Sequence, residues 1–212
     1  YDLSAVHIFV DATIVRPDGT NEYDEYYTCL RQRGFVEVQL HPGGRCLKEQ
    51  YQIFFEFFGN EDKIILPSDT VPRIIWRTKT GSVQTDELPK NHLLPLIHVG
   101  FDLCRQEGAR AWSLASCKIG INLQAGHVSR KCGLLCGNFC GVRLDVQPRI
   151  QMTVSDYTTD VEFSLRAWAA DKCMIRFLGI AAEHVYRARG GHRLDKESGD
   201  QRFINTCGAI QM

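Results

Sequence analysis

Residues 160–169 read Asp-Val-Glu-Phe-Ser-Leu-Arg-Ala-Trp-Ala, and apolar side chains recur there at every second position. In an extended strand, successive side chains point to opposite faces, so these apolar residues would share one face. Residues 34–40 repeat the pattern, with Val36, Val38 and Leu40 on one side. Such alternation is typical of a strand buried on one face, and both stretches are predicted to be strands.

Many other short runs have strand-like composition. Turn-forming residues separate them at short intervals, as in Pro17-Asp18-Gly19 and Gly190-Gly191. The further strands are expected at residues 6–15, 50–58, 63–66, 73–78, 111–115, 118–123, 141–146, 150–154, 173–178 and 181–188. Short strands with frequent turns indicate an all-β fold. We expect one domain over residues 1–212, a multi-stranded antiparallel sandwich or partly closed barrel.

Two windows favour helix instead of strand. Residues 21–33 place Tyr26, Leu30 and Arg33 on one side of a helix, and residues 94–106 form the second window. The fold is therefore expected to contain one or two short helices. Residues 187–202, which are rich in Arg, Gly, Asp and Ser, are predicted to be a surface loop.

Charge and hydropathy narrow the class of partner. Lys plus Arg total 25 and Asp plus Glu total 25, so no overall field attracts nucleic acid or an anionic membrane. The apolar runs are shorter than the roughly 18 residues of a membrane span. Neither nucleic-acid binding nor membrane insertion is expected. Because the first residue is Tyr1, we expect a domain excised from a longer polypeptide.

Nine cysteines cannot all pair within one chain, so at least one thiol is free. The sequence also has no Asn-x-Ser/Thr acceptor for N-glycosylation. Both features favour synthesis in a reducing, cytoplasmic compartment. Free cysteines are often buried, and most of these are expected to lie in the interior.

The most unusual motif is a Cys-Gly pair repeated every four residues, at Cys132, Cys136 and Cys140, with His127 upstream. Three thiolates and an imidazole could hold zinc, although zinc sites mostly use Cys-x2-Cys turns and none is present. On a strand the three cysteines would share one face and the glycines the other, where something could pack closely. We expect a buried, glycine-flattened segment and no metal or cofactor.

Two segments carry residue types suited to ligand binding. Residues 21–27 mix tyrosines with acids, and tyrosine offers a large contact area together with a hydroxyl group. The alternative is a helical turn whose tyrosines pack on the sheet. Trp76 and Arg77 form a second pair, which could stack on a sugar or peptide or lie in a subunit interface. The candidate ligand-binding residues are Tyr23, Asp24, Glu25, Tyr26, Trp76 and Arg77.

No catalytic signature is present. The sequence has no Gly-x-Ser-x-Gly elbow, phosphate loop or His-Glu-x-x-His motif. Asp11 ends an apolar run, as in folds that bind magnesium, but the short spacing leaves little room for the crossover helices of those folds. We expect no enzymatic activity and no catalytic residues, although triads can assemble from distant positions.

The size, the expected β architecture and the free cysteines together resemble the projection, or spike, domain of a small non-enveloped virus capsid, such as that of astroviruses. The resemblance covers the whole chain at the level of architecture and assigns no role to any residue. It implies a homodimer on the virion surface that attaches to a host receptor or a glycan.

Two other functions stay open. One is a cellular lectin-like or protein-binding β domain, which would use calcium or a shallow aromatic pocket. The other is a hydrolase on a β scaffold, which would bring Cys, His and acid groups together in a cleft.

Overall fold

The structure is a computed structural model that describes residues 3–13, 15, 17–45, 47–59, 63–67, 71–78, 84–115, 123–152 and 159–183. Its contacts divide the chain into two compact units, Tyr1–Phe57 and Phe58–Met212, where the sequence predicts a single domain. Each unit is described below by itself.

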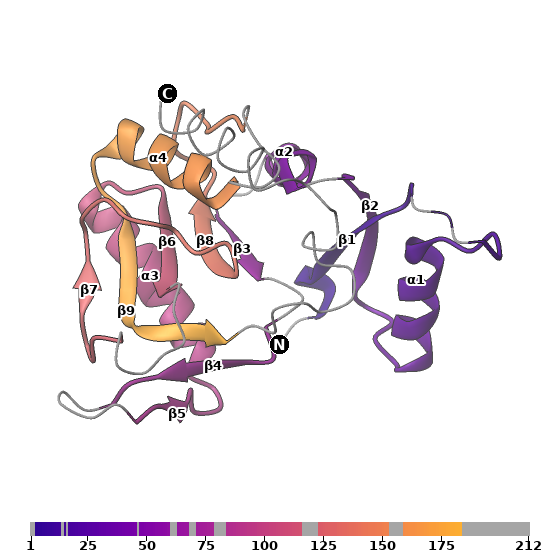
Figure 1. The fold of residues 1–212 in the computed structure, drawn as a ribbon, viewed down its shortest axis with the longest axis horizontal. Helices are drawn as coiled ribbons and strands as arrows, with labels where there is room; N and C mark the ends of the chain where they lie inside the picture. Colours follow the sequence, from indigo (N-terminus) through magenta and orange to yellow (C-terminus); the bar gives the residue numbers. More distant parts are fainter. Residues whose placement is uncertain are drawn as a thin grey trace. The chain divides into compact units, whose positions relative to one another are not determined.

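The first unit is built around two parallel strands. Its elements are the 3-10 turn η1 (Leu3–Ala5), β1 (His7–Asp11), α1 (Glu22–Gln32), β2 (Gln39–Gly43) and α2 (Leu47–Phe57). Strands β1 and β2 pair in register, with Phe9 opposite His41. Parallel neighbours need a crossover connection, and α1 supplies it (Figure 1). This unit is therefore a β-α-β-α unit, which the antiparallel prediction did not include.

Helix α1 lies within the helix predicted for residues 21–33. It begins after Asn21, whose side chain accepts a hydrogen bond from the backbone N of Asp24 at 2.8 Å. This is an N-cap, and the acidic residues that follow suit the positive end of the helix dipole. The strand predicted at residues 34–40 begins later than expected, since β2 covers Gln39–Gly43 and residues 34–38 form a turn and bends.

The strand predicted at residues 50–58 is wrong, because helix α2 occupies most of it. Its buried side chains are Tyr51 and Phe55, which are four residues apart and so lie on one face of a helix. Phe54 and Phe57 add ring contacts to Phe9 of β1. The aromatic residues that alternate in the sequence therefore lie on adjacent sides of a helix, and Phe57 among them is 49% exposed.

The second unit contains a seven-stranded mixed sheet (Figure 1). Its strands are β3 (Lys63–Pro67), β4 (Arg73–Trp76), β5 (Asp86–Glu87), β6 (Ala111–Ala115), β7 (Val128–Ser129), β8 (Phe139–Arg143) and β9 (Ile175–Glu183). The order is β3-β8-β6-β9-β4-β5, with β7 also paired to β9. Strands β6 and β9 are parallel and the other pairs are antiparallel.

The sheet curls along its longest strand, β9. The first half of β9 pairs with β6 and β7, and its second half pairs with β4. The register against β6 shifts between Leu114 and Ala115, a bulge of the kind that bends a strand. Figure 1 shows β9 turning where its neighbour changes. The β-rich prediction is confirmed in this coarse sense, but the sheet is mixed and the described residues hold four α-helices instead of one or two.

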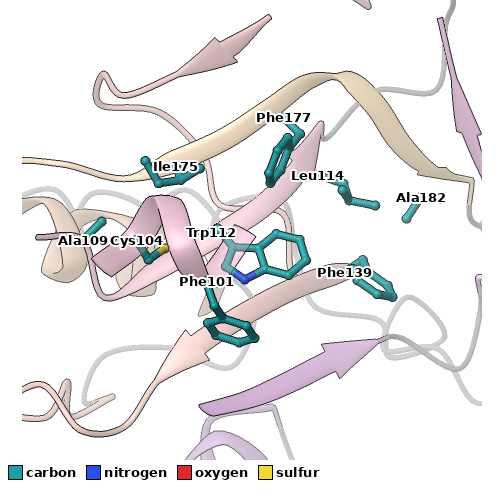
Figure 2. Packing of buried hydrophobic residues seen from close by; sticks show 9 residues of the cluster. All are labelled: Phe101, Cys104, Ala109, Trp112, Leu114, Phe139, Ile175, Phe177 and Ala182. Atoms are coloured by element: carbon teal, nitrogen blue, oxygen red, sulfur yellow. The ribbon is translucent and has the colours of Figure 1, made fainter. Parts of the chain in front are cut away.

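Helix α3 (Leu93–Glu107) covers one face of this sheet and agrees with the helix predicted at residues 94–106. Trp112 is fully buried in the core under it, edge-on to Phe101 of α3 at 5.8 Å between ring centroids. Figure 2 shows the indole among Phe101, Phe139 and Phe177. Gly100 and Gly141 make room for it, because an added Cβ would lie within 2.6 Å of an indole atom at either position.

The strand predicted at residues 160–169 is wrong, because helix α4 (Thr159–Asp171) replaces it. Its buried residues include Thr159, Phe163 and Ala167, which recur every four positions as on one face of a helix. Several other predicted strands are confirmed approximately, at residues 6–15, 63–66, 73–78, 111–115 and 141–146. The two strands predicted at 173–178 and 181–188 are one strand in the structure, β9 (Ile175–Glu183).

Some predictions fall wholly or partly outside the described residues. These are the strand at 118–123, the ends of the strands at 150–154 and 181–188, and most of the loop at 187–202. Residues 150–152, which are described, form no strand. No helix in the described ranges is long and apolar enough to span a membrane.

Candidate functional site

Helix α1 is attached to the first unit without burying any of its eleven residues. The Asn21 cap fixes its start, and the hydroxyl of Tyr23 donates to the carbonyl O of Leu40 on β2 at 3.2 Å. A helix held by local contacts of this kind leaves most of its side chains in solvent.

The four predicted binding residues on α1 divide into two groups. Tyr23 is half-buried and bound to β2, so it serves packing, as the alternative interpretation of this segment expects. Asp24 and Glu25 are exposed in the first turn, where carboxylates also stabilise the helix dipole. Tyr26 is 39% exposed. Tyr26 and the two acids are thus exposed to solvent.

The same helix also carries exposed residues that sequence reasoning missed. Tyr27 is 49% exposed, and the guanidinium carbon of Arg31 lies 5.1 Å from the centre of its ring. A nitrogen of Arg31 donates to the backbone O of Val36, and Val36 and its neighbour Phe35 are exposed as well. We call Tyr26, Tyr27, Arg31, Phe35 and Val36 the tyrosine surface.

A helical period could have revealed part of this surface. Tyr27 and Arg31 are four residues apart, which places them side by side on a helix. Phe35 and Val36 were assigned to opposite faces of a strand at residues 34–40. In the structure they follow a turn and are both exposed, so the alternation there does not mark a buried face.

Trp76 and Arg77 lie at the end of β4, in the second unit. Trp76 is half-buried, and its Nε1 is buried without a hydrogen-bond partner in the described part of the chain. Arg77 donates from its side chain to the backbone O of Leu123 and from its backbone N to O of Gly179. Arg77 is therefore committed to holding neighbouring segments of its own unit. The pair and the residues of α1 belong to different units.

The first unit also contains a histidine cluster on the face of the sheet that α2 covers. Nδ1 of His7 lies 2.9 Å from Nε2 of His41, and the two rings stack at 5.1 Å between centroids. Phe57 of α2 lies against both rings, at 5.4 Å from His7 and 4.5 Å from His41. Burial, followed by the nearby charge of His7, lowers the pKa of His41.

The Cys-Gly repeat does not form the continuous, buried strand that was expected for it. Only its end belongs to β8, and Cys132 is exposed whereas Cys136 and Cys140 are buried, so the three thiols do not share a face. Within the described ranges, no three His, Cys, Asp or Glu side chains are grouped so that they could hold a metal ion.

The glycines of this repeat do allow close packing, as the sequence suggests. At each of the three, an added Cβ would collide with a side chain of a different element. The Cβ added at Gly133 would lie 2.3 Å from Cζ of Arg176. The Cβ added at Gly137 would lie 2.7 Å from Oδ1 of Asp160, and the one at Gly141 would lie 2.2 Å from Nε1 of Trp112. Side chains of β9, α4 and β6 therefore pack against the backbone of the repeat, each at one of its glycines.

The buried thiols are poorly suited to nucleophilic catalysis. Burial is the main cause that raises the pKa of Cys104 to about 12, and it also raises the pKa of Cys136 and Cys140. The thiolate is the reactive form, so a raised pKa lowers reactivity at neutral pH. Asp160 lies near the last two thiols, and burial raises the pKa of its carboxyl group as well.

Comparison with known proteins gives no family. The chain matches no family model, no curated protein and no solved structure.

Proposed function

We propose that this chain is a non-catalytic recognition module that binds its partner through the tyrosine surface of the first unit. The observation that carries the proposal is helix α1, which buries none of its residues, exposes Tyr26 and Tyr27, and places Arg31 against the ring of Tyr27. Tyr27 beside Arg31, together with the exposed Phe35 and Val36, offers a partner both apolar contact area and hydrogen-bonding groups.

The chemistry of this surface suits a polar partner with a flat face. Tyrosine and arginine are enriched among the residues that dominate binding energy, because each combines a large contact area with hydrogen-bonding groups. Asp24 and Glu25 at the start of the helix add acceptors for hydroxyl groups. A glycan supplies both sugar faces that stack on aromatic rings and hydroxyl groups that donate to carboxylates.

The narrower proposal is a projection of a non-enveloped virus capsid, displayed as a homodimer on the virion surface, that attaches to a host receptor or glycan. The curled sheet of the second unit is compatible with the partly closed barrel of such an architecture. Free thiols at Cys104, Cys136 and Cys140 suit assembly in a reducing compartment.

Binding of the labelled full chain to cultured cells tests the proposal. We expect saturable binding that soluble glycans compete away or that glycosidase treatment of the cells reduces. Competition by glycans with no dependence on the cell type favours a lectin-like module. The absence of saturable binding, together with turnover in a pooled substrate screen, would overturn the proposal in favour of an enzyme.

A further inference from the structure

The histidine cluster of the first unit holds two imidazole rings in one hydrogen bond, inside an aromatic setting. We propose that the His7–His41 pair is a pH-sensitive contact that keeps helix α2 packed on strands β1 and β2 at neutral pH and loosens this packing in mild acid. The inference concerns regulation and does not depend on the partner of the tyrosine surface.

The number of protons decides whether the contact can exist. With both rings neutral, one ring nitrogen donates and the other accepts across the 2.9 Å separation. A first added proton leaves one donor and one acceptor, and the bond becomes charge-assisted. A second proton removes the only acceptor and places two positive rings in direct contact. The contact therefore survives the first proton but not the second.

Aromatic rings pack against the pair and partly bury it. Phe9 stacks on His41 at 4.8 Å, and the tilted ring of Phe57, which is 49% exposed, lies 4.5 Å from it between ring centroids. The residues of α2 that face the strands recur at positions 50, 54 and 57, and none of them is charged. The charge that acts on His41 is that of His7.

Two carboxylates on the packed elements have other hydrogen-bond partners. Asp11, at the far end of β1 from His7, accepts hydrogen bonds from the backbone and the hydroxyl of Thr13. Glu49 accepts from the backbone N of Arg45. The remaining charged residues of α2 and α1 are Lys48, Glu56, Glu22, Asp24, Glu25 and Arg31, of which Glu56, Asp24, Glu25 and Arg31 are exposed.

The sign of the pH effect follows from the lowered pKa of His41. When the folded state binds protons less readily than the unfolded state, a fall in pH favours the unfolded state. The contribution of the pair is complete above the ordinary histidine pKa of about 6.5 and declines as the pH falls below it. Because Phe57 touches both rings, the C-terminal turn of α2 is the first element expected to loosen.

Hydrogen–deuterium exchange of the full chain at pH 7.5 and pH 5.5 tests the switch, after correction for the intrinsic pH dependence of amide exchange. In the wild type, the opening equilibrium of residues 7–11, 39–43 and 51–57 should rise by up to about tenfold at the lower pH. His41→Gln keeps a polar atom near the position of Nε2 but cannot titrate, so its opening should not depend on pH. His98→Gln, which removes an exposed histidine on α3, is the matched control and should behave as the wild type.

An equal acid response in His41→Gln, or no response in the wild type, would overturn the proposal. An NMR titration of the histidine ring protons in the wild-type protein is a second, independent test of the proposal. The pKa of the His41 ring should lie below the ordinary histidine value of about 6.5. A pKa of His41 at or above that value would overturn the proposal.

Discussion

Arg110 holds a full positive charge in the interior of the second unit, with 4% of the residue exposed. Its side chain makes two hydrogen bonds to the carboxylate of Asp171, at 2.7 and 2.8 Å, and a third to the backbone O of Pro148. The backbone N of Arg110 also donates to Asp171. One residue thereby joins the start of β6 to the end of α4.

We predict that Asp171→Asn lowers the free energy of unfolding by about 3–5 kcal/mol, because it leaves a buried guanidinium without its counter-charge. Urea denaturation followed by circular dichroism measures the change. The matched control is Asp102→Asn, which removes an exposed Asp–Arg pair on α3 and should cost less than about 1 kcal/mol. Equal losses in the two variants would show that burial of the Arg110 pair has no special weight.

Contacts of single residues with distant parts of the chain explain why the sequence could predict the site only in part. Tyr26, Asp24 and Glu25 are exposed, and their role in binding stays a prediction. The sequence could not show that Tyr23 turns inward, since its bond to Leu40 joins residues 17 positions apart. Arg77 is a similar case, because its partner Leu123 is distant in the chain.

At the scale of elements, two helices were mistaken for strands for one physical reason. In a short stretch, a helix can also have apolar residues two positions apart. Ten residues form fewer than three helical turns, so the helical period of 3.6 is hard to distinguish from the strand period of two. In α4, Val161 and Leu165 are half-buried and suggest period two, whereas the fully buried Phe163 and Ala167 also fit a helix. Helices α1 and α3 were predictable because strand-like alternation is absent from them.

The contact of α3 with the sheet depends on the space that two glycines leave for Trp112. We predict that Gly141→Ala lowers the free energy of unfolding by about 1–3 kcal/mol, because the new Cβ would overlap the buried indole. Combining it with Trp112→Phe should cost less than the sum of the two single changes, since the smaller ring frees the space. Urea denaturation of the three variants forms a double-mutant cycle. Strictly additive losses would contradict this account of the packing.

At the scale of the whole molecule, the two units differ in the size of their cores. Among the described residues, the buried apolar side chains of the first unit are Val10, Val38, Tyr51 and Phe55, whereas the second unit has a large cluster around Trp112. Residues with few buried apolar contacts open at low free energy. Stability should therefore be distributed unevenly along the chain.

We predict that amide exchange at pH 7 is slowest in β6, β8 and the first half of β9 and fastest among the described helices in α1. The reason is that all five residues of β6 are buried, whereas no residue of α1 is. Mass spectrometry of exchanged peptides gives the order directly. Protection in α1 equal to that in β6 would mean that α1 is covered, which would also remove the tyrosine surface from solvent.

The measurement that tests the central claim most directly is the affinity of three variants for the cell-surface partner. Tyr27→Ala and Arg31→Ala should each weaken binding by about 30-fold, as expected for residues worth about 2 kcal/mol at an interface. Arg105→Ala, which removes an exposed arginine from α3, is the matched control and should bind as the wild type. All variants should keep the wild-type circular dichroism spectrum. Wild-type affinity in both α1 variants would contradict recognition through the tyrosine surface.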